Sequence, residues 1–309
     1  MARSNSKPET TYDCLGLGVN AVDHLCILDP YPALDDKVDA KRSSVQGGGP
    51  VPTAMVTLAK LGAKVCYVGK VGDDPDGEFV RAQFKKEGVD TRYLLVDKKT
   101  KTSRASIWID KGSGKRTVVL DRDRKNRLKR AELGFTNSAS ARFVHLDARE
   151  VEINVLVARW ARKQKAQVCL DVGSLRNGVE KVFPFVDHLI VSSRFACGFT
   201  KTSDPDKACR ALMRRQFKTV VVTVGESGCI CAAKNRLFRS PGFPVKVADT
   251  TGAGDVFHGA FIYGLLKRWS FKRTAKFANA CAAMKCRKLG GRAGIPTLNE
   301  VESFVGDFS

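Results

Sequence analysis

The sequence predicts an α/β fold in which helices cover both faces of a mainly parallel sheet, with a small β-sheet lid attached. Short apolar runs typical of buried strands alternate along the chain with stretches whose apolar residues recur at helical spacing. Two further segments break this alternation and have the pattern of paired strands. At 309 residues and 43% hydrophobic, the chain can bury the core of one large domain.

The alternation begins near the N-terminus, after a polar tail over residues 1–11. It starts with an apolar strand over 12–19 (YDCLGLGV), a helical pattern over 51–61 and a second strand over 64–69. Further strands are predicted over 167–172, 188–191 and 219–224, a helix over 155–165, and two amphipathic helices over 256–269 and 271–288. These elements indicate one domain over residues 12–308.

The two segments that break the alternation are residues 25–45 and 102–120. In the second, two apolar runs flank Asp110, Lys111, Gly112, Ser113 and Gly114, as the strands of a hairpin flank its turn. We assign both segments to the lid.

The composition predicts the cellular compartment of the protein and the redox state of its cysteines. The chain has no run of eighteen apolar residues and begins without the apolar stretch of a secretory signal, so we expect a cytoplasmic protein that contacts no membrane. Its ten cysteines stand singly in apolar segments, lack a zinc-ligand spacing and are expected to be reduced.

The net charge of +21 is typical of proteins that meet polyanions, although a solvated basic surface also explains it. The basic runs 98–104 and 122–130 carry no interleaved aromatic residues on which bases could stack. This disfavours a dedicated nucleic-acid-binding protein without excluding one.

The segment 247–259 (VADTTGAGDVFHG) carries the clearest chemical signal, because a strand end runs through a small-residue turn into a long helix. Gly252, Ala253 and Gly254 let backbone N–H groups approach an anion at the positive end of the helix dipole. Asp255 follows directly and could act as a base beside that anion, or simply as a first-turn charge of the helix. Both groups are required for phosphoryl transfer to a hydroxyl.

DTTGAGD followed by an amphipathic helix closely resembles the C-terminal signature of the ribokinase-like (PfkB) carbohydrate kinases. The resemblance extends from about residue 12 to 308 and includes GLGVNAVD at 16–23, QGGGP at 46–50, GKVGDDPDG at 69–77 and TVGESG at 223–228. It implies the ribokinase-like three-layer fold with a β-sheet lid, and an ATP-dependent kinase that phosphorylates a sugar hydroxyl.

The resemblance also implies roles for single residues. Asp255 is the implied base, and Gly252, Ala253 and Gly254 form the anion hole. Asp23, Gly48 and Gly49 contact the sugar, although Asp23 could instead cap a connection and the glycines could serve only helix packing. The implied ATP-binding residues are Thr223, Gly225, Gly228 and Asn279, the last on the exposed face of its helix.

Metal sites are less well defined. Many relatives carry an Asn-x-x-Glu motif that organises Mg²⁺, whereas this chain reads SSRFA at 192–196, so no protein ligand for Mg²⁺ is assigned. The resemblance allows a monovalent cation, such as K⁺, near Asp249 and Thr251.

ADTTGAGDVFHGA at 248–260 and MKCRKLGGRAGIP at 284–296 resemble sulfofructose kinases and ketohexokinases, which also lack that Mg²⁺ motif. This resemblance implies a ketose, either fructose or a 6-sulfo or 6-phospho ketose. Lys37 and Arg149 would hold an anionic end, or would belong to the general basic surface.

Two alternatives to a sugar kinase stay open at this point. A nucleoside kinase would use the same machinery, and a catalytically weak scaffold associated with nucleic acid would account for the charge. Besides ATP and the sugar, the expected partner is a second copy of the chain, joined through the exposed face of the lid.

Overall fold

The computed structural model describes residues 10–234 and 236–306. Most of the polar tail therefore lies outside the described residues, and Thr10 and Thr11 already belong to the first strand. Within the described part, no helix is both long enough and apolar enough to cross a membrane.

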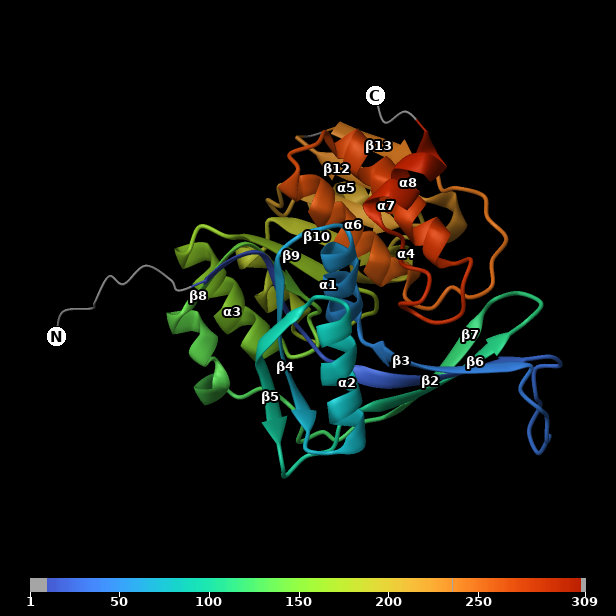
Figure 1. The fold of residues 1–309 in the computed structure, drawn as a ribbon. Helices are drawn as coiled ribbons and strands as arrows, with labels where there is room; N and C mark the ends of the chain where they lie inside the picture. The colour runs from blue at the N-terminus through green and yellow to red at the C-terminus, as the bar shows by residue number, and fades with distance from the viewer. Residues whose placement is uncertain (1–9, 235, 307–309) are drawn as a thin grey trace.

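A nine-stranded sheet forms the centre of the molecule, in the order β13-β12-β11-β10-β9-β8-β1-β4-β5 (Figure 1). All neighbouring pairs from β5 to β11 are parallel, and only β12 runs against its neighbours. The strands are β1 Thr10–Leu17, β4 Val65–Gly72, β5 Asp90–Asp97, β8 Ala139–Leu146, β9 Gln167–Val172, β10 His188–Ser192, β11 Thr219–Thr223, β12 Cys229–Ala233 and β13 Arg236–Ser240.

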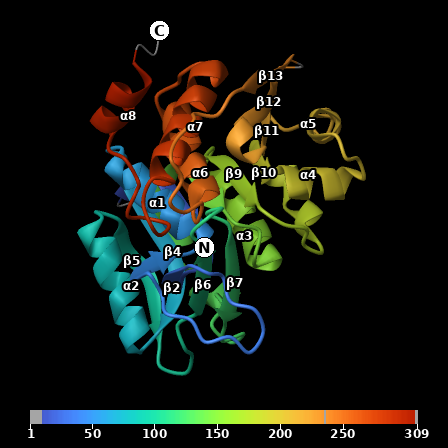
Figure 2. The same cartoon turned by 90° about the vertical axis from the view of Figure 1, so that its right-hand side faces the viewer.

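Helices cover both faces of this sheet, which confirms the predicted fold class. One apolar core joins one face to α3 (Val151–Lys163), α4 (Ser193–Thr200) and α5 (Pro205–Met213). A second core joins the other face to α1 Pro50–Lys60, α2 Pro75–Lys86, α6 Ala253–Leu266, α7 Phe271–Lys285 and α8 Leu298–Val305 (Figure 2). Because both faces are buried, the strands are nearly continuous apolar runs, which is why the sequence revealed several of them.

The lid is a separate four-stranded sheet in the order β3-β2-β6-β7, projecting to one side of the central sheet (Figure 1). Its strands are β2 Ala21–Leu28, β3 Arg42–Gly48, β6 Arg104–Asp110 and β7 Arg116–Asp121. The predicted hairpin turn is present, since the backbone N–H of Asp110 donates to Lys115 and that of Gly114 donates to Asp110. The first lid segment begins at Ala21 rather than at residue 25, so Asp23 lies within a lid strand.

The lid is fixed at its base by the segment that follows α7. Leu289 packs into the small apolar core on the inner side of the lid. The side chain of Gln46 on β3 donates to the Leu289 carbonyl at 2.9 Å and accepts from the backbone N–H of Arg292 at 3.2 Å. The segment after α7 is therefore tied directly to the lid.

Candidate active site

A cavity of about 520 Å³ lies between the lid and the carboxyl ends of the central strands. Its walls include Asn20 after β1, Arg149 after β8 and Thr251 before α6. Ala105 and Ile107 of β6 close it from the lid side, each opposite a β7 residue in the hairpin register. The carboxyl ends of parallel strands are where open α/β sheets bind their ligands.

The small-residue turn forms one wall of this cavity. Gly252 has φ +75°, in the left-handed region, and a Cβ there would lie 2.8 Å from the Cα of Gly291. The Asp249 carboxylate fixes the turn by accepting the backbone N–H groups of Thr251 and Gly290, both at 2.8 Å. Helix α6 then begins at Ala253, whose backbone N–H donates to the Thr250 carbonyl at 3.2 Å, while the N–H groups of Gly254 and Asp255 have no intrahelical acceptor. The turn therefore presents free donors to an anion.

Asp255 lies in the first turn of α6 and lines the same cavity. Burial raises the pKa of Asp255 to about 7, the nearby Asp171 carboxylate adds to this rise, and Arg116 and Arg149 oppose it. No side chain caps the start of α6, and Asp255 is not its N-cap residue. A carboxylate with a pKa near neutrality is well suited to accept a proton from a hydroxyl.

Asp23 lies on the lid side of the cavity, in β2. Burial raises the pKa of Asp23 to about 7, the Arg292 guanidinium opposes this rise, and Asp255 adds to it. A Cβ at position 48 would lie 2.1 Å from Oδ1 of Asp23, so Gly48 makes room for this carboxylate. Gly49, with φ +99°, lines the cavity next to it. Asp23 and Asp255 therefore line one cavity, the first from a lid strand and the second from the start of a helix.

The lid hairpin contacts Thr250, two residues before the small-residue turn begins at Gly252. Nη1 of Arg116, at the start of β7, donates to the Thr250 hydroxyl at 3.1 Å. That hydroxyl donates in turn to the Gly114 carbonyl in the hairpin turn at 3.2 Å. Arg116 also lines the cavity, and the sequence pattern gave no signal that this exposed strand residue would meet the turn.

The structure brings some of the other predicted residues together and leaves others apart. Arg149 lines the cavity, whereas Lys37 is exposed on the lid connection between β2 and β3 and is not part of the lining. Thr223 ends β11, and Gly225 and Gly228 form the turn after it, at the same edge of the sheet but outside this cavity.

Asn279 is buried, so the expectation that it lies on an exposed helix face is wrong. Its side-chain amide donates to the carbonyls of Ser240 at 3.0 Å and Pro241 at 3.1 Å. The segment after β13 crosses α7 at this point and covers it, which helical periodicity could not reveal. Any role of Asn279 in nucleotide binding is then the positioning of residues 240–242.

The segment at 192–196, which stands in place of the Asn-x-x-Glu motif, stabilises the start of α4. The Ser192 hydroxyl donates to the Gly173 carbonyl at 2.8 Å and accepts the backbone N–H of Phe195 at 3.1 Å, which caps α4. No acidic side chain stands at 192–196, and among residues 10–234 and 236–306 no group of three His, Cys, Asp or Glu residues could hold a metal.

Fold and site together are typical of a small-molecule kinase: a lidded α/β domain in which the start of a helix and buried carboxylates share one cavity. A profile of the pfkB family carbohydrate kinases matches residues 19–298, and the chain belongs to that family. It is therefore a phosphotransferase that phosphorylates sugars at the expense of ATP.

Similar proteins of known name fall in the same group. The ribokinase of Haemophilus influenzae is 26% identical, covering 94% of this chain and 97% of that protein. Probable fructokinase-5 of Arabidopsis thaliana is 29% identical, covering 84% and 87%. The solved structure of a putative ribokinase II from Escherichia coli, in complex with ATP and Mg²⁺, is 20% identical and superimposes with a TM-score of 0.81 over 95% of this chain and 99% of that chain.

These comparisons correct one expectation. The relatives are ribokinases and fructokinases, not the sulfofructose kinases or ketohexokinases that the C-terminal motifs resemble. The DTTGAGD turn lines the cavity and its helix packs in the core, so the sequence of these two parts does not identify the sugar.

Proposed function

We propose that this kinase transfers the γ-phosphoryl group of ATP to a hydroxyl of a ketose, with fructose as the reference acceptor. The observation that supports this proposal is that Asp255 and Gly252, the first residue of the turn, line the same cavity as Asp23. An acceptor hydroxyl held by Asp23 would lie between the base and the anion hole, as in-line transfer requires.

In this reaction Asp255 accepts the hydroxyl proton as the sugar oxygen attacks the γ-phosphorus. The first-turn N–H groups of α6 stabilise the charge on the transferring phosphoryl oxygens. The lid, held to Thr250 by Arg116 and Gly114, keeps water away from the phosphate, because water in the acceptor position would hydrolyse ATP.

The nucleotide is proposed to lie over the carboxyl end of β11, with Thr223, Gly225 and Gly228 along it. Gly225 has φ +64°, and a Cβ there would meet nothing within 4 Å, so the turn leaves open space for a ligand. Mg²⁺ enters as part of the MgATP substrate, and no residue of the chain is assigned to it.

ATP turnover over a panel of fructose, ribose and adenosine tests the acceptor class. We expect fructose to give the highest kcat/KM, and a preference for adenosine would identify a nucleoside kinase instead. A DNA-binding titration at several salt concentrations accompanies it. A scaffold on nucleic acid would bind DNA with a steep salt dependence and turn over none of the three acceptors.

A buried lysine changes the prediction of a monovalent-cation site near Asp249 and Thr251. Lys285 is 0% exposed, and its ammonium donates to the backbone carbonyl of Asp249 at 2.7 Å. Burial lowers the pKa of Lys285 and Asp249 opposes this effect. The carbonyl that would ligate K⁺ beside Asp249 already has a cationic donor, so the residues present do not fit a bound K⁺. We propose that Lys285 supplies the positive charge here.

Activity should therefore be the same in potassium, sodium and choline salts. Lys285→Met should lower kcat, and K⁺ or NH₄⁺ should restore part of the loss, because a small cation can enter the space left by the ammonium. Lys288→Met, at an exposed lysine of the same segment, is the matched control and should behave as the wild type. A wild-type enzyme that requires K⁺ would contradict this proposal.

The outer face of the lid supports the expected homodimer. Val119 is 55%, Val45 48% and Trp108 42% exposed, and the strand register places all three on the side away from the cavity. Light scattering should show a dimer that Trp108→Glu converts to a monomer. Val96→Glu, at an exposed apolar residue of the central sheet, should leave the dimer intact. A wild-type monomer at all concentrations would reject this interface.

A further inference from the structure

The cavity is more basic than the acceptor of a simple sugar kinase requires. Seven lysine and arginine residues line it, against four aspartate and glutamate residues. Two of those carboxylates, Asp23 and Asp255, already have roles toward a neutral sugar. A neutral sugar offers nothing to balance the excess of cations, so the charge itself needs an explanation.

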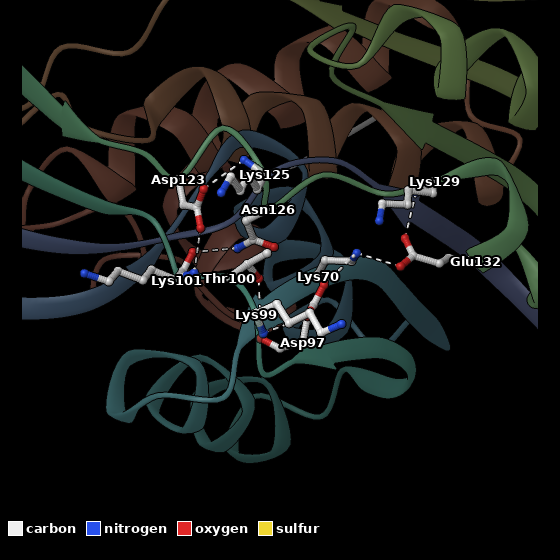
Figure 3. Close-up of polar contacts among 10 residues, drawn as sticks. All are labelled: Lys70, Asp97, Lys99, Thr100, Lys101, Asp123, Lys125, Asn126, Lys129 and Glu132. Carbon is white, nitrogen blue, oxygen red and sulfur yellow. Dashed lines mark hydrogen bonds and ion pairs between the residues drawn. The ribbon is translucent and has the colours of Figure 1, made fainter.

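Some of these cations are neutralised or occupied within the protein. Nζ of Lys70 lies 3.3 Å from Oδ2 of Asp97 and 2.6 Å from Oε1 of Glu132, and Figure 3 shows this buried lysine between its partners. Arg116 donates to Thr250 at the catalytic turn. Lys70 and Arg116 therefore do not form an open anion site.

The side chains of Arg122, Arg149 and Arg176 are less engaged, although Nη2 of Arg176 donates to the Ser174 hydroxyl at 3.4 Å. They come from the loops after β7, β8 and β9, and all three line the cavity. Across residues 10–234 and 236–306, none of the three makes an ion pair with a carboxylate within 4.0 Å. The neighbouring carboxylate of Asp147 is engaged by backbone N–H groups, from Val19 at 2.9 Å and Arg149 at 3.0 Å.

The three guanidinium groups also repel one another. Burial lowers the pKa of Arg122, and Arg149 and Arg176 lower it further. Burial likewise lowers the pKa of Arg176, again with a contribution from Arg149. Arg149 and Arg176 are half-buried and Arg122 is exposed. Holding these like charges together costs free energy, mainly at the two half-buried residues, and an anion bound among the three would offset that cost.

The loop that carries Arg122 is held in place before any ligand binds. The Asp123 carboxylate accepts the backbone N–H groups of Lys101 at 2.9 Å and Lys125 at 2.8 Å. The Asn126 side chain donates to the Lys101 carbonyl at 2.9 Å, so the loop is fixed on both sides of its turn (Figure 3). A fixed loop loses little conformational entropy on binding.

We propose that Arg122, Arg149 and Arg176 form a subsite for an anionic group, a phosphate or sulfonate, carried by the sugar at the end away from the reacting hydroxyl. This inference rests on the proposed function. Planar guanidinium groups recognise such tetrahedral oxyanions through paired N–H donors. Arg122 and Arg176 thus take the place that the sequence gave to Lys37, which lies outside the cavity.

Two features indicate that the anionic group bound here belongs to the sugar acceptor and not to ATP. The arginines share the cavity with Asp23 and with the inner face of the lid, at Ala105 and Ile107. The proposed nucleotide-binding residues Thr223, Gly225 and Gly228 do not line it. A subsite for the nucleotide phosphates would be expected to open toward that turn.

The test combines kinetics with binding. Wild type, Arg122→Ala, Arg176→Ala and the conservative Arg176→Lys are assayed with fructose, fructose 6-phosphate and 6-deoxy-6-sulfofructose at saturating ATP. Calorimetry without ATP then measures binding of fructose 6-phosphate. Lys125→Ala is the matched control, because this exposed lysine is in the same loop but outside the cavity. Thermal unfolding checks that each variant folds.

The wild type should prefer an anionic ketose to fructose, and the more active of the two anionic sugars identifies the natural anion. Each arginine-to-alanine variant should lose at least about 10-fold in kcat/KM for that sugar, with a much smaller loss on fructose, since charge-assisted contacts are the strong ones. Arg176→Lys should recover part of the loss, and Lys125→Ala should match the wild type. Binding of fructose 6-phosphate should weaken in parallel.

Equal losses on charged and neutral sugars would overturn the subsite, and so would wild-type affinity for fructose 6-phosphate in both alanine variants. A raised KM for ATP with unchanged sugar parameters would assign the arginines to the nucleotide. Turnover of fructose without any preference for the anionic sugars would reject this inference and leave the proposed function standing. Absence of turnover on every sugar, with arginine-dependent binding of fructose 6-phosphate, would reject the proposed function alone.

Discussion

Asp255→Asn is expected to lower kcat at least ~100-fold, the lower end of what a positioned general base contributes, while ATP binding is preserved. The amide keeps the shape of the carboxylate at the start of α6 but cannot accept the hydroxyl proton. Steady-state kinetics and calorimetric ATP binding measure the two effects. Asp23→Asn is the contrasting variant, which should act mainly by raising KM for the sugar.

The pH dependence gives a second check on the same residue. Burial raises the pKa of Asp255 to about 7, so the wild-type rate should rise as the pH passes through about 7 and should fall below it. The residual rate of Asp255→Asn should show no such rise. Near-normal turnover of the variant, or an unchanged pH profile, would remove Asp255 from the role of base.

The thermal stability of Asp255→Asn shows whether the variant loses activity because the base is absent or because the protein unfolds. A carboxyl whose folded pKa exceeds its unfolded value favours folding at low pH, and this contribution is lost as the pH rises from about 4 through about 7. At pH 8 the ionised, desolvated Asp255 therefore costs stability, which the neutral amide does not. The melting temperature of Asp255→Asn at pH 8 should equal or exceed that of the wild type.

Gly252→Ala is expected to damage both stability and activity. The residue has φ +75°, and the new Cβ would lie 2.8 Å from the Cα of Gly291, a backbone atom that cannot move without the loop. Strain of this kind costs on the order of 1–3 kcal/mol and would shift the turn that presents the anion hole. Urea unfolding and kcat measure the two losses.

Gly254→Ala is the matched control, two residues further on. A Cβ at Gly254 would meet nothing within 4 Å, and the residue lies in the first turn of α6, where alanine is favourable. The stability of Gly254→Ala should equal or exceed that of the wild type, whatever the added methyl group does to phosphate binding. Equal destabilisation by both substitutions would show that the left-handed turn at Gly252 is not the reason for its glycine.

The catalytic turn could be predicted because its parts are local. Seven consecutive residues, Asp249 to Asp255, hold the anion hole and the base at one junction of loop and helix. Five of the seven parallel strands were visible because burial on both faces makes them largely apolar, as in β9 and β10. The other two, β5 and β8, were not predicted. β5 is an edge strand that begins with three polar residues and is only partly buried.

Of the proposed basic subsite, only Arg149 was predicted from the sequence, because the subsite depends on residues distant in sequence. Arg149 and Arg176 follow neighbouring strands of the central sheet, and Arg122 follows a lid strand that lines the same cavity. In the sequence, Arg122 belongs to a basic run that is typical of a solvated surface. The sequence also assigned Lys37 to the anionic end of the sugar because of its charge. In the structure Lys37 lies on the long connection between β2 and β3 and is exposed to solvent.

The central claim is transfer of the γ-phosphoryl group of ATP to a sugar hydroxyl. Incubation with ATP carrying three ¹⁸O atoms at the non-bridging γ positions, followed by mass spectrometry of the sugar product, tests it most directly. We predict a sugar phosphate with all three ¹⁸O atoms and a bridging oxygen from the sugar, formed in equal amount to ADP. ADP accompanied only by labelled inorganic phosphate, with no labelled sugar, would contradict the assignment.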